Sequence, residues 1–434
     1  MKIPVLKQIE QITAEFNPDI LAPQQETDIQ LLTDDMLDLK ISCQGFAEIV
    51  YVTGHSVHSS KCYATGDGLK TATVGEETIV TLHTKDTYER ECDVLLQDVN
   101  ASLLSTKHST TVKCNITWEQ KGTYTVSYQP TTRGRHKLYL KINGKIVKGS
   151  PHNVIVRPNL QSPVKVIPSL NMPWCVTTDS KGQIIVTEWN GHRVSIYSPK
   201  WDKIKSLCSG SCSSTKGQFK YPAGITVDND DNIYVVDNHS HCVQKFSSDG
   251  RFIASAGTYG SNPLQFNYAL GMGFNKKNGK LYVCDRDNHR IQILGTDLNL
   301  YCSFGSIGSG FGQFNSPYNI AFDRSGIVYA ADINNHRIQV FTPEGLYLRK
   351  FGSEGAGAGQ LSFPTGIAID GDRVYVAEHG NNRVSVFSTE GRFLKSFGHK
   401  GKEKSQFKSP RSIHVNKDGF ILIADRCNDR IQVY

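Results

Sequence analysis

Short apolar strands separated by polar turns recur through the C-terminal part of the chain. Pro222–Asp228, Pro317–Asp323 and Pro364–Asp370 share one pattern, in which a proline is followed by small and β-branched residues and an acidic end. Each leads into a second apolar run, such as Val328–Asp332, then a polar turn and a third run. The turn-ending position falls at residues 193, 242, 290, 337, 383 and 430, in steps of 46 to 49 residues. A repeat of about 40–50 residues with four short strands predicts the blades of a β-propeller.

Six such repeats predict a six-bladed propeller over residues 161–434. A four-stranded sheet cannot bury both of its faces alone, so the repeats must pack against one another. We expect the blades to begin near residues 173, 222, 269, 317, 364 and 410. The sixth repeat stops one strand short at Tyr434, and an isolated strand at 164–167 precedes the first repeat. We expect this strand to complete the last blade and to close the ring, which removes exposed sheet edges.

The turn before each third strand repeats acidic, Asn, His and Arg residues, as in Asp285–Arg290 and Asp332–Arg337. Asp and Asn side chains bind their own turn backbone and tolerate left-handed φ angles, and an arginine can bridge blades through a carboxylate or carbonyls. We therefore assign a structural role to the repeated turn residues Asp237, Asp285, Asn288, Arg290, Asp332, Arg337, Arg383, Asp425 and Arg430. Cys242 stands where the second blade would carry its arginine. The D-x-x-N-H-R motif resembles the signature of NHL repeats, and the resemblance covers residues 161–434.

A separate β domain is expected over residues 61–157. Alternating patterns predict strands at Thr78–His83, Val94–Leu96, Thr111–Cys114, Thr123–Tyr128, His136–Lys141 and Asn153–Val156. This spacing is typical of an immunoglobulin-like sandwich of about 100 residues. Three segments, Gly66–Leu69, Gly122–Pro130 and Asn143–Pro151, resemble a filamin repeat.

Residues 1–60 form an acidic leader with a net charge of −6. Val5, Leu6, Ile9, Ile12 and Phe16 fall at helical spacing, which suits the tail of a coiled coil. Beyond Asn17–Pro18 the composition predicts a linker to about residue 36.

A filamin repeat followed by six NHL blades resembles the C-terminal half of the TRIM-NHL proteins. Family members are E3 ubiquitin ligases through a RING domain, and this sequence holds no Cys/His series with zinc-binding spacing. We therefore expect either a truncated or a shortened relative, without ubiquitin transfer, metal or cofactor. Some related propellers are metal-dependent hydrolases or lyases. Here His192, His289 and His336 share one equivalent turn position, which repetition explains better than metal binding.

Positive charge gathers on the propeller, where residues 161–434 carry a net charge of +8. The turns and blade connections emerge on one face, the upper face, and the connection at 398–411 is rich in lysine. Basic groups interleaved with aromatic rings favour recognition of single-stranded or hairpin RNA, which the resemblance to TRIM-NHL regulators of mRNA also implies. The candidate RNA-binding residues are Lys216, Lys220, Tyr221, Arg286, Tyr318, His399, Lys400, Lys402, Lys404, Lys408, Arg411, Arg426, Trp174 and Trp189. The alternative is a scaffold that recognises protein partners or substrates for a RING-type ubiquitin ligase system.

The remaining features limit the compartment and the partners. No apolar run approaches the roughly 20 residues that span a bilayer, and no secretory signal is visible. Eleven cysteines without a CxxC pair suggest reduced thiols. We expect a cytoplasmic protein, with neither a membrane nor DNA as a partner.

Overall fold

The computed structural model describes residues 57–106, 109–208 and 212–434, which form an all-β protein. The expected helix and linker of the leader lie outside the described residues. The contacts within the chain separate it into two compact units, and each is described by itself. In the described ranges no helix is long and apolar enough to cross a membrane, and all ten cysteines are free thiols.

The first unit is a sandwich of two sheets. One sheet has the strand order β1 (Tyr63–Thr65), β3 (Thr78–His83), β7 (Thr123–Tyr128), β6 (Asn115–Gln120). The other has the order β2 (Thr71–Thr73), β10 (His152–Arg157), β8 (Gly134–Ile142), β4 (Val99–Ser105), β5 (Thr111–Lys113), with β9 (Lys145–Ile146) beside β8. Alternate residues of β3, β8 and β10 face the core, where Leu82, Tyr124 and Leu138 are fully buried.

The prediction of a strand at Val94–Leu96 is wrong. The chain there runs into a short 3-10 turn, η3 (Leu96–Asp98), and Leu95 and Leu96 are about half exposed. The backbone of Val94 is satisfied by the hydroxyl of Tyr124, which accepts from its N–H and donates to its carbonyl, both at 2.7 Å. No strand is needed to satisfy these groups, and the strand that follows is β4.

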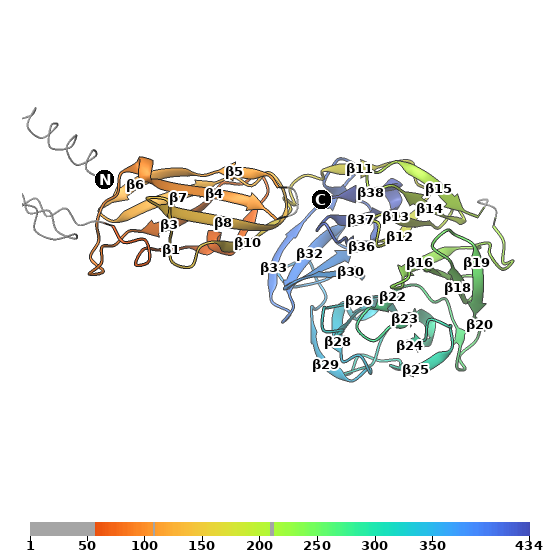
Figure 1. Ribbon diagram of the computed structural model, residues 1–434. Helices are drawn as coiled ribbons and strands as arrows, with labels where there is room; N and C mark the ends of the chain where they lie inside the picture. The colour runs from red at the N-terminus through yellow and green to blue at the C-terminus, as the bar shows by residue number, and fades with distance from the viewer. Residues whose placement is uncertain (1–56, 107–108, 209–211) are drawn as a thin grey trace, which may run out of the picture. The chain divides into compact units, whose positions relative to one another are not determined.

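The second unit consists of six four-stranded antiparallel sheets in a ring (Figure 1). The inner strands are β12 (Pro173–Thr178), β16 (Pro222–Val227), β22 (Met272–Asn275), β26 (Pro317–Phe322), β30 (Pro364–Asp370) and β36 (Pro410–Val415). The second strands are β13 (Ile184–Glu188), β17 (Ile233–Asp237), β23 (Lys280–Asp285), β27 (Val328–Asp332), β31 (Arg373–Glu378) and β37 (Ile421–Asp425). Each inner strand contacts the next, and β36 contacts β12, so the inner strands surround a common centre.

Two further strands complete each blade. The third strands are β14 (Arg193–Tyr197), β18 (Cys242–Phe246), β24 (Arg290–Leu294), β28 (Arg337–Phe341), β32 (Arg383–Ser388) and β38 (Arg430–Val433). The outer strands of the first five blades are β15 (Lys203–Leu207), β19 (Phe252–Ala256), β25 (Leu300–Phe304), β29 (Tyr347–Phe351) and β33 (Phe393–Phe397). Two blade connections carry short parallel pairs, β20 (Thr258–Tyr259) with β21 (Gln265–Phe266) and β34 (His399–Lys400) with β35 (Gln406–Phe407).

The outer strand of the sixth blade comes from the other end of the propeller sequence. β11 (Lys165–Ile167) pairs antiparallel with β38, placing Lys165 opposite Val433 and Ile167 opposite Ile431. The side chain of Ile167 is 2% exposed and belongs to a cluster with Leu422 and Val433. The pairing joins the first and last segments of the propeller in one sheet.

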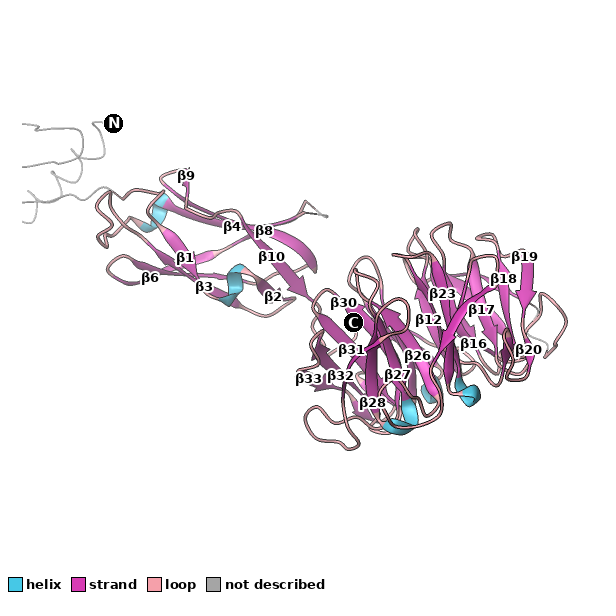
Figure 2. Cartoon of the chain, turned by 90° about the horizontal axis from the view of Figure 1, so that it is seen from below, coloured by secondary structure: helices cyan, strands magenta, loops and turns pink. Residues whose placement is uncertain are grey.

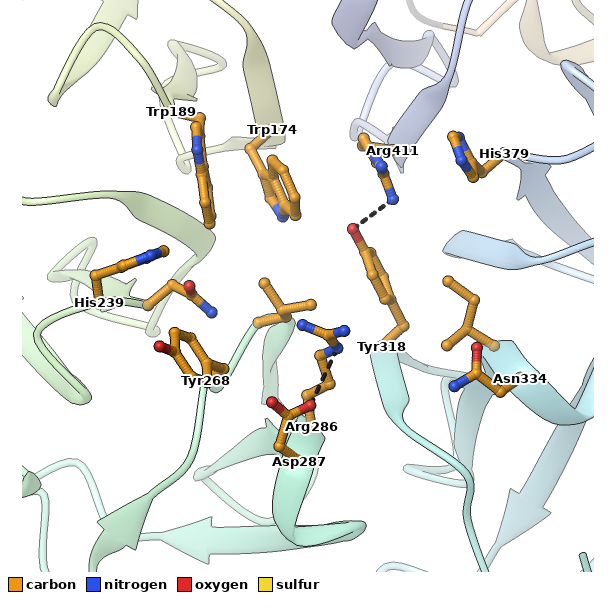
Figure 3. A pocket seen from close by; sticks show the side chains of 13 residues that line it. Trp174, Trp189, His239, Tyr268, Arg286, Asp287, Tyr318, Asn334, His379 and Arg411 are labelled. Atoms are coloured by element: carbon orange, nitrogen blue, oxygen red, sulfur yellow. Dashed lines mark hydrogen bonds and ion pairs between the residues drawn. The ribbon is translucent and has the colours of Figure 1, made fainter. Parts of the chain in front are cut away.

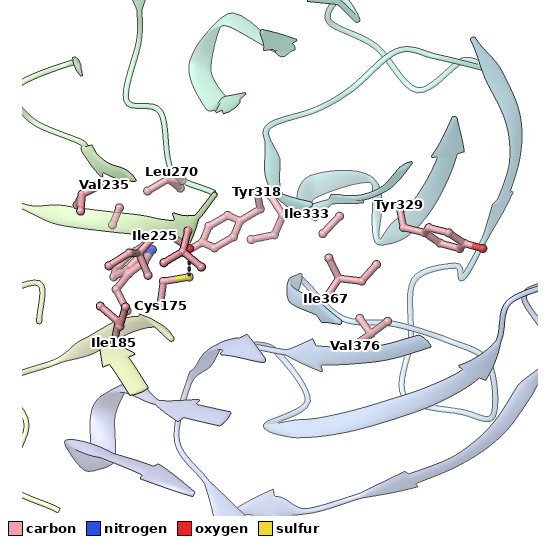
Figure 4. Packing of buried hydrophobic residues seen from close by; sticks show 14 of the residues in the cluster. Cys175, Ile185, Ile225, Val235, Leu270, Tyr318, Tyr329, Ile333, Ile367 and Val376 are labelled. Atoms are coloured by element: carbon pink, nitrogen blue, oxygen red, sulfur yellow. Dashed lines mark hydrogen bonds between the residues drawn. The ribbon is translucent and has the colours of Figure 1, made fainter. Parts of the chain in front are cut away.

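The space between blades is filled by large side chains at repeated positions. The second strands contribute the fully buried rings of Tyr234, Tyr282, Tyr329 and Tyr375, and the blade connections contribute Phe219, Phe266, Phe314 and Phe407. Figure 4 shows Ile185, Ile225 and Val235 on one side of Tyr318 and Ile367 and Val376 on the other, all members of one buried cluster. The core is therefore continuous from blade to blade.

The upper face is formed by the turns between second and third strands together with the blade connections. Three of these turns contain 3-10 segments, η4 (Arg286–Asn288), η5 (Ile333–Asn335) and η6 (Arg426–Asn428), and Figure 2 shows them along one edge of the propeller. The opposite, lower face carries the turns between inner and second strands, such as 179–183 and 276–279. The candidate site lies on the upper face.

We expect Ile167→Ala to lower the free energy of unfolding by about 2–4 kcal/mol, because it opens a cavity in the sheet that closes the ring. Val164→Ala is the control, since Val164 is 63% exposed and should cost less than about 0.5 kcal/mol. Urea titration followed by tryptophan fluorescence measures both. Equal midpoints for Ile167→Ala and the unchanged protein would show that the closing strand adds nothing to stability.

Candidate functional site

A buried ion pair sits at the base of five of the six turns on the upper face. The acidic residue that ends the second strand binds the arginine that begins the third, at 2.8 Å in Asp332–Arg337 and 2.7 Å in Asp425–Arg430. The other pairs are Glu188–Arg193, Asp285–Arg290 and Glu378–Arg383. Every one of these carboxylates is 0% exposed. A charge removed from water in this way needs both an opposite charge and hydrogen bonds.

The fourth blade shows what else each pair holds. The guanidinium of Arg337 donates to the carbonyl oxygens of Ser309, Gly310 and Gln313 in the connection that enters the blade. Asp332 accepts the N–H of Asn315 at 2.7 Å from the end of the same connection. The ion pair thus fastens the blade connection to the turn.

The fifth residue of each turn has a left-handed backbone. His192, His241, His289, His336, Asn382 and Asp429 have φ angles between 48° and 53°. Nδ1 of His289 accepts the N–H of Ser316 at 3.1 Å, and Nδ1 of His336 accepts that of Phe363 at 3.2 Å. These imidazoles bind backbone groups of the next connection, and the described residues contain no group of three or more side chains suited to a metal ion.

The second blade replaces its ion pair with neutral hydrogen bonds. The carboxylate of Asp237 accepts from the hydroxyl of Ser240 at 2.7 Å and from the N–H groups of Lys220 and Tyr221 at 2.8 and 2.9 Å. Cys242, in the place of the arginine, stays a neutral thiol because burial raises its pKa to about 12. In the second blade, too, the buried carboxylate binds the connection that enters the blade, but through neutral donors in place of an arginine.

Two positions per blade carry side chains that do not repeat, and nine of these twelve residues line one cavity. The residue after the start of each inner segment gives the strand ring, Trp174, Ala223, Leu270, Tyr318, Thr365 and Arg411. The residue after the buried carboxylate gives the turn ring, Trp189, Asn238, Arg286, Ile333, His379 and Arg426. The blades share one strand order, so side chains of different chemistry stand at equivalent sequence positions of the repeat.

Members of both rings line a cavity of about 450 Å³ (Figure 3). Among its lining residues Trp174, Leu270, Tyr318 and Ile333 are buried apolar side chains, each at most 8% exposed. The lining is completed by Trp189, Asn238, His239, Tyr268, Arg286, Asp287, Asn334, His379 and Arg411. This volume lies in the range of small-molecule sites, about 300–1,000 Å³.

Two arginines meet at this cavity without an acidic partner. Arg411 donates from Nη1 to the hydroxyl of Tyr318 at 2.8 Å, and its guanidinium lies 5.1 Å from the ring centre of Trp174. The guanidinium of Arg426 lies 5.0 Å from the same ring. The structure shows no carboxylate in ion-pair range of either arginine in the described ranges, and the Nε atom of each is buried without a hydrogen-bond partner.

The charges around these arginines are unbalanced. Burial and the nearby Arg411 lower the pKa of Arg426. Burial, with help from Arg411 and Arg426, lowers the pKa of His379 to about 4, so this imidazole is neutral at physiological pH. Its Nδ1 shares a hydrogen bond of 2.7 Å with the hydroxyl of Ser409. A third arginine, Arg286, is paired at 3.3 Å with Asp287. The cavity therefore presents excess positive charge.

A series of aromatic rings leads from the cavity toward the rim. Trp174 and Trp189 stack with ring centres 4.2 Å apart, and Tyr221 lies 5.1 Å from Trp189. The series continues through His239, Tyr268 and His241 to Tyr259, with successive ring centres 4.4 to 5.3 Å apart. Tyr259, at its outer end, is 65% exposed.

The candidate residues fall into two groups. Trp174, Trp189, Arg286, Tyr318 and Arg411 line the cavity, with Arg426 and Tyr221 in contact with its walls. The others lie on blade connections outside it, and all but Lys220 are exposed: Lys216, Lys220, His399, Lys400, Lys402, Lys404 and Lys408.

Charge and aromaticity did not point to the cavity residues Asn238, Ile333, Asn334 and His379. The signal that could have found three of them is alignment of the repeats, because Asn238, Ile333 and His379 each follow the buried carboxylate of their blade.

The two kinds of arginine should respond differently to replacement. Arg337→Leu leaves the fully buried Asp332 without its cation, and we expect it to cost about 3–5 kcal/mol. Arg426→Leu removes a cation that has no carboxylate, and should change the free energy of unfolding by less than about 1 kcal/mol. Urea unfolding of both variants is the measurement. Similar losses of unfolding free energy in the two variants would contradict the distinction between arginines that stabilise the fold and arginines that belong to the site.

The chain matches two family models. A Filamin/ABP280 repeat covers residues 56–153, and NHL repeats cover residues 170–197, 219–246, 266–294, 361–387 and 407–434. The matched NHL segments fall in five of the six blades.

Known proteins resemble the chain in sequence and in fold. Tripartite motif-containing protein 2 of Homo sapiens is 27% identical over 237 residues, which are 50% of this chain and 30% of that protein. The E3 ubiquitin-protein ligase TRIM71 of Bos taurus is 32% identical over 193 residues, which are 42% of this chain and 21% of that protein. The matches thus span less than a third of either relative. A solved structural genomics protein of unknown function from Bacteroides thetaiotaomicron aligns with a TM-score of 0.53 at 13% identity, over 87% of this chain and 97% of that one, a likeness of fold alone.

Proposed function

Because the chain belongs to the TRIM-NHL family, we propose that the upper face of its propeller binds RNA. Filamin and NHL repeats are non-catalytic interaction domains, so the chemistry to account for is that of recognition. The observation that carries the proposal is the pair of arginines, Arg411 and Arg426, held together without a carboxylate.

Two guanidinium groups over one indole repel each other in the absence of an anion. A phosphate relieves this repulsion and accepts charge-assisted hydrogen bonds from the guanidinium groups. Arginine is suited to this role, since its planar donor fork matches phosphate oxygens. The arrangement supports a phosphate at the centre of the face.

The aromatic series supports nucleic acid over a simple anion. Unpaired bases stack on aromatic side chains, and this contribution is largely independent of base identity. The series from Trp189 to Tyr259 begins at the cavity and runs from the first blade across the second to the connection that enters the third. Single strands and loops expose the unstacked bases that such rings can bind, whereas paired stems do not.

The lysines of the connection 398–409 add attraction at longer range. Lys400, Lys402 and Lys404 are exposed, and the backbone beneath them is held by Arg430, which donates to the carbonyl of Lys402 at 2.6 Å. Within a Debye length of about 8 Å these charges attract a phosphate backbone in physiological salt. The uncharged connection at 305–316 contributes no such attraction, so the attraction is uneven around the ring.

Replacing Lys400, Lys402 and Lys404 together by Glu should weaken binding to a single-stranded RNA. It should also reduce the slope of log affinity against log salt by about 0.7 for each phosphate that the variant no longer neutralises. Fluorescence anisotropy of a labelled RNA over a series of salt concentrations gives both quantities. The matched control is Lys181→Glu with Lys276→Glu and Lys277→Glu, the same charge change on exposed residues of the lower face.

Two results would overturn the proposal. One is an absence of salt-dependent RNA affinity in the unchanged protein. The other is an equal loss in the lower-face control, which would remove the upper face from the interaction.

A protein partner is the second candidate, and one surface favours it. The uncharged connection at 305–316 exposes Ile307 and Phe311 at 67% and 73%, and Phe311 stacks on Tyr347 with ring centres 5.0 Å apart. Exposed apolar side chains held in place are typical of protein interfaces.

Ile307→Ser combined with Phe311→Ser should abolish capture of protein partners that remain bound after RNase treatment, and should leave RNA affinity unchanged. Affinity capture with and without RNase, compared between this variant and the unchanged protein, is the measurement. If both proteins capture the same RNase-resistant partners, the apolar connection is not their docking surface.

A further inference from the structure

The central cavity has the size and the lining residues expected of a binding site for one nucleotide. We infer that it binds a single nucleoside monophosphate unit, with the phosphate at Arg411 and Arg426 and the base against the opposite wall. The inference rests on the proposed function for the source of that unit, which is either an unpaired residue of a bound RNA or a free nucleotide. The two sources share one chemistry, and the experiment below separates them.

The volume of the cavity limits the size of the occupant. Trp174, Leu270, Tyr318 and Ile333 are at most 8% exposed, and about 450 Å³ is open among the lining residues. This is room for one ligand of small-molecule size. A paired stem, which presents its phosphates outward and its bases inward, could rest on the face but could not enter.

The cationic side of the cavity fixes where the phosphate lies. Arg411 is anchored by its hydrogen bond to the hydroxyl of Tyr318 at 2.8 Å, which occupies one of its donors. Arg426 lies over the same indole of Trp174. Its Nη1 and Nη2 contact sulfur acceptors, those of Cys427 and Met172, both at 3.9 Å. An anion with several acceptor oxygens can take donors from both groups at once.

The opposite side of the cavity is aromatic and amide-lined. Figure 3 shows His239 and Tyr268 across the cavity from Arg411 and His379, with Trp189 beside Trp174. Asn238, the chain neighbour of His239, also lines the cavity, whereas Asn334 lies below His379 on the other side (Figure 3). Rings offer a stacking surface to a base, and amides can both donate to and accept from its edge. A bare phosphate would leave this half of the cavity unused.

The neighbouring groups leave the anion site available. His379 is neutral at physiological pH and neither adds to nor removes positive charge. Asp287, the acidic residue of the wall, is paired with Arg286 at 3.3 Å. The charge of Arg411 and Arg426 is therefore left for a ligand.

Calorimetric titration of the full chain with the four nucleoside 5′-monophosphates tests the inference, beside the four matching nucleosides and inorganic phosphate as the two halves of each ligand. We expect saturable binding of at least one monophosphate at one site. Its affinity should exceed that of its own nucleoside and of phosphate by about tenfold or more, since each half lacks the interactions of the other. Binding of phosphate as tight as that of every monophosphate would reduce the site to an anion site and overturn the inference.

Arg411→Gln should lower the affinity for the monophosphate by about tenfold or more. Arg411→Lys, which keeps the charge and removes the planar donor fork, should also lower this affinity. Arg426→Gln is the second variant, because Arg411 also holds Tyr318 and its replacement could disturb the fold. Melting temperatures show which variants are folded. The lower-face variant Lys181→Gln with Lys276→Gln and Lys277→Gln should bind the monophosphate as the unchanged protein does. Unchanged affinity in folded Arg411 and Arg426 variants would overturn the inference.

Competition separates this inference from the proposed function. If single-stranded RNA displaces a fluorescent monophosphate, the unit belongs to RNA. If the monophosphate binds and RNA does not displace it, the cavity takes a free nucleotide. RNA binding without any monophosphate binding would overturn the cavity inference and leave the proposed function standing. If the protein binds neither RNA nor a monophosphate, the cavity inference and the proposed function are both overturned.

Discussion

The carboxylate that ends the second strand is completely buried in all six blades, and the upper face depends on how that charge is satisfied. An isolated buried carboxylate is strongly unfavourable. The propeller surrounds it with an arginine in five blades and with backbone N–H groups of the entering connection. Since those N–H groups belong to the chain between two blades, satisfying the charge also fixes the path of each connection. The geometry of the face is thus set by framework residues that the ligand need not touch.

This division leaves the inward-facing positions free to differ. Trp174, Tyr318 and Arg411 occupy one equivalent place in three blades, while Ala223 and Thr365 occupy it in two others. The same fold therefore holds a small side chain or a large one there, and a neutral one or a charged one. The asymmetry of the site, with Arg411 on one side and His239 and Tyr268 on the other, comes from such differences between blades on a nearly symmetric frame.

Sequence reasoning reached the repeat because its period, its turn residues and its β-branched runs agree with one another. The placement of Lys165–Ile167 beside Arg430–Val433 could be inferred by counting strands. The strand expected at Val94–Leu96 was wrong because three apolar residues in a row satisfy the pattern, whereas the structure gives the Val94 backbone a tyrosine hydroxyl. The cavity could not be predicted from the sequence, for another reason. Trp174 and Arg411 are neighbours because the ring closes, and no local pattern carries that information.

The pairing of β11 with β38 also determines when, during synthesis of the chain, the ring can close. Their residues are 268 positions apart, as in Lys165 and Val433, so on the ribosome one partner is made before every other propeller strand and the other after them. The sixth sheet is completed last, and until then the first blade has no neighbour on one side. The entropic cost of closing so long a loop grows only slowly with its length, but contacts this distant in sequence slow folding. The nascent propeller therefore spends most of its synthesis as an open arc with apolar surface at both ends, and closure is a single late event.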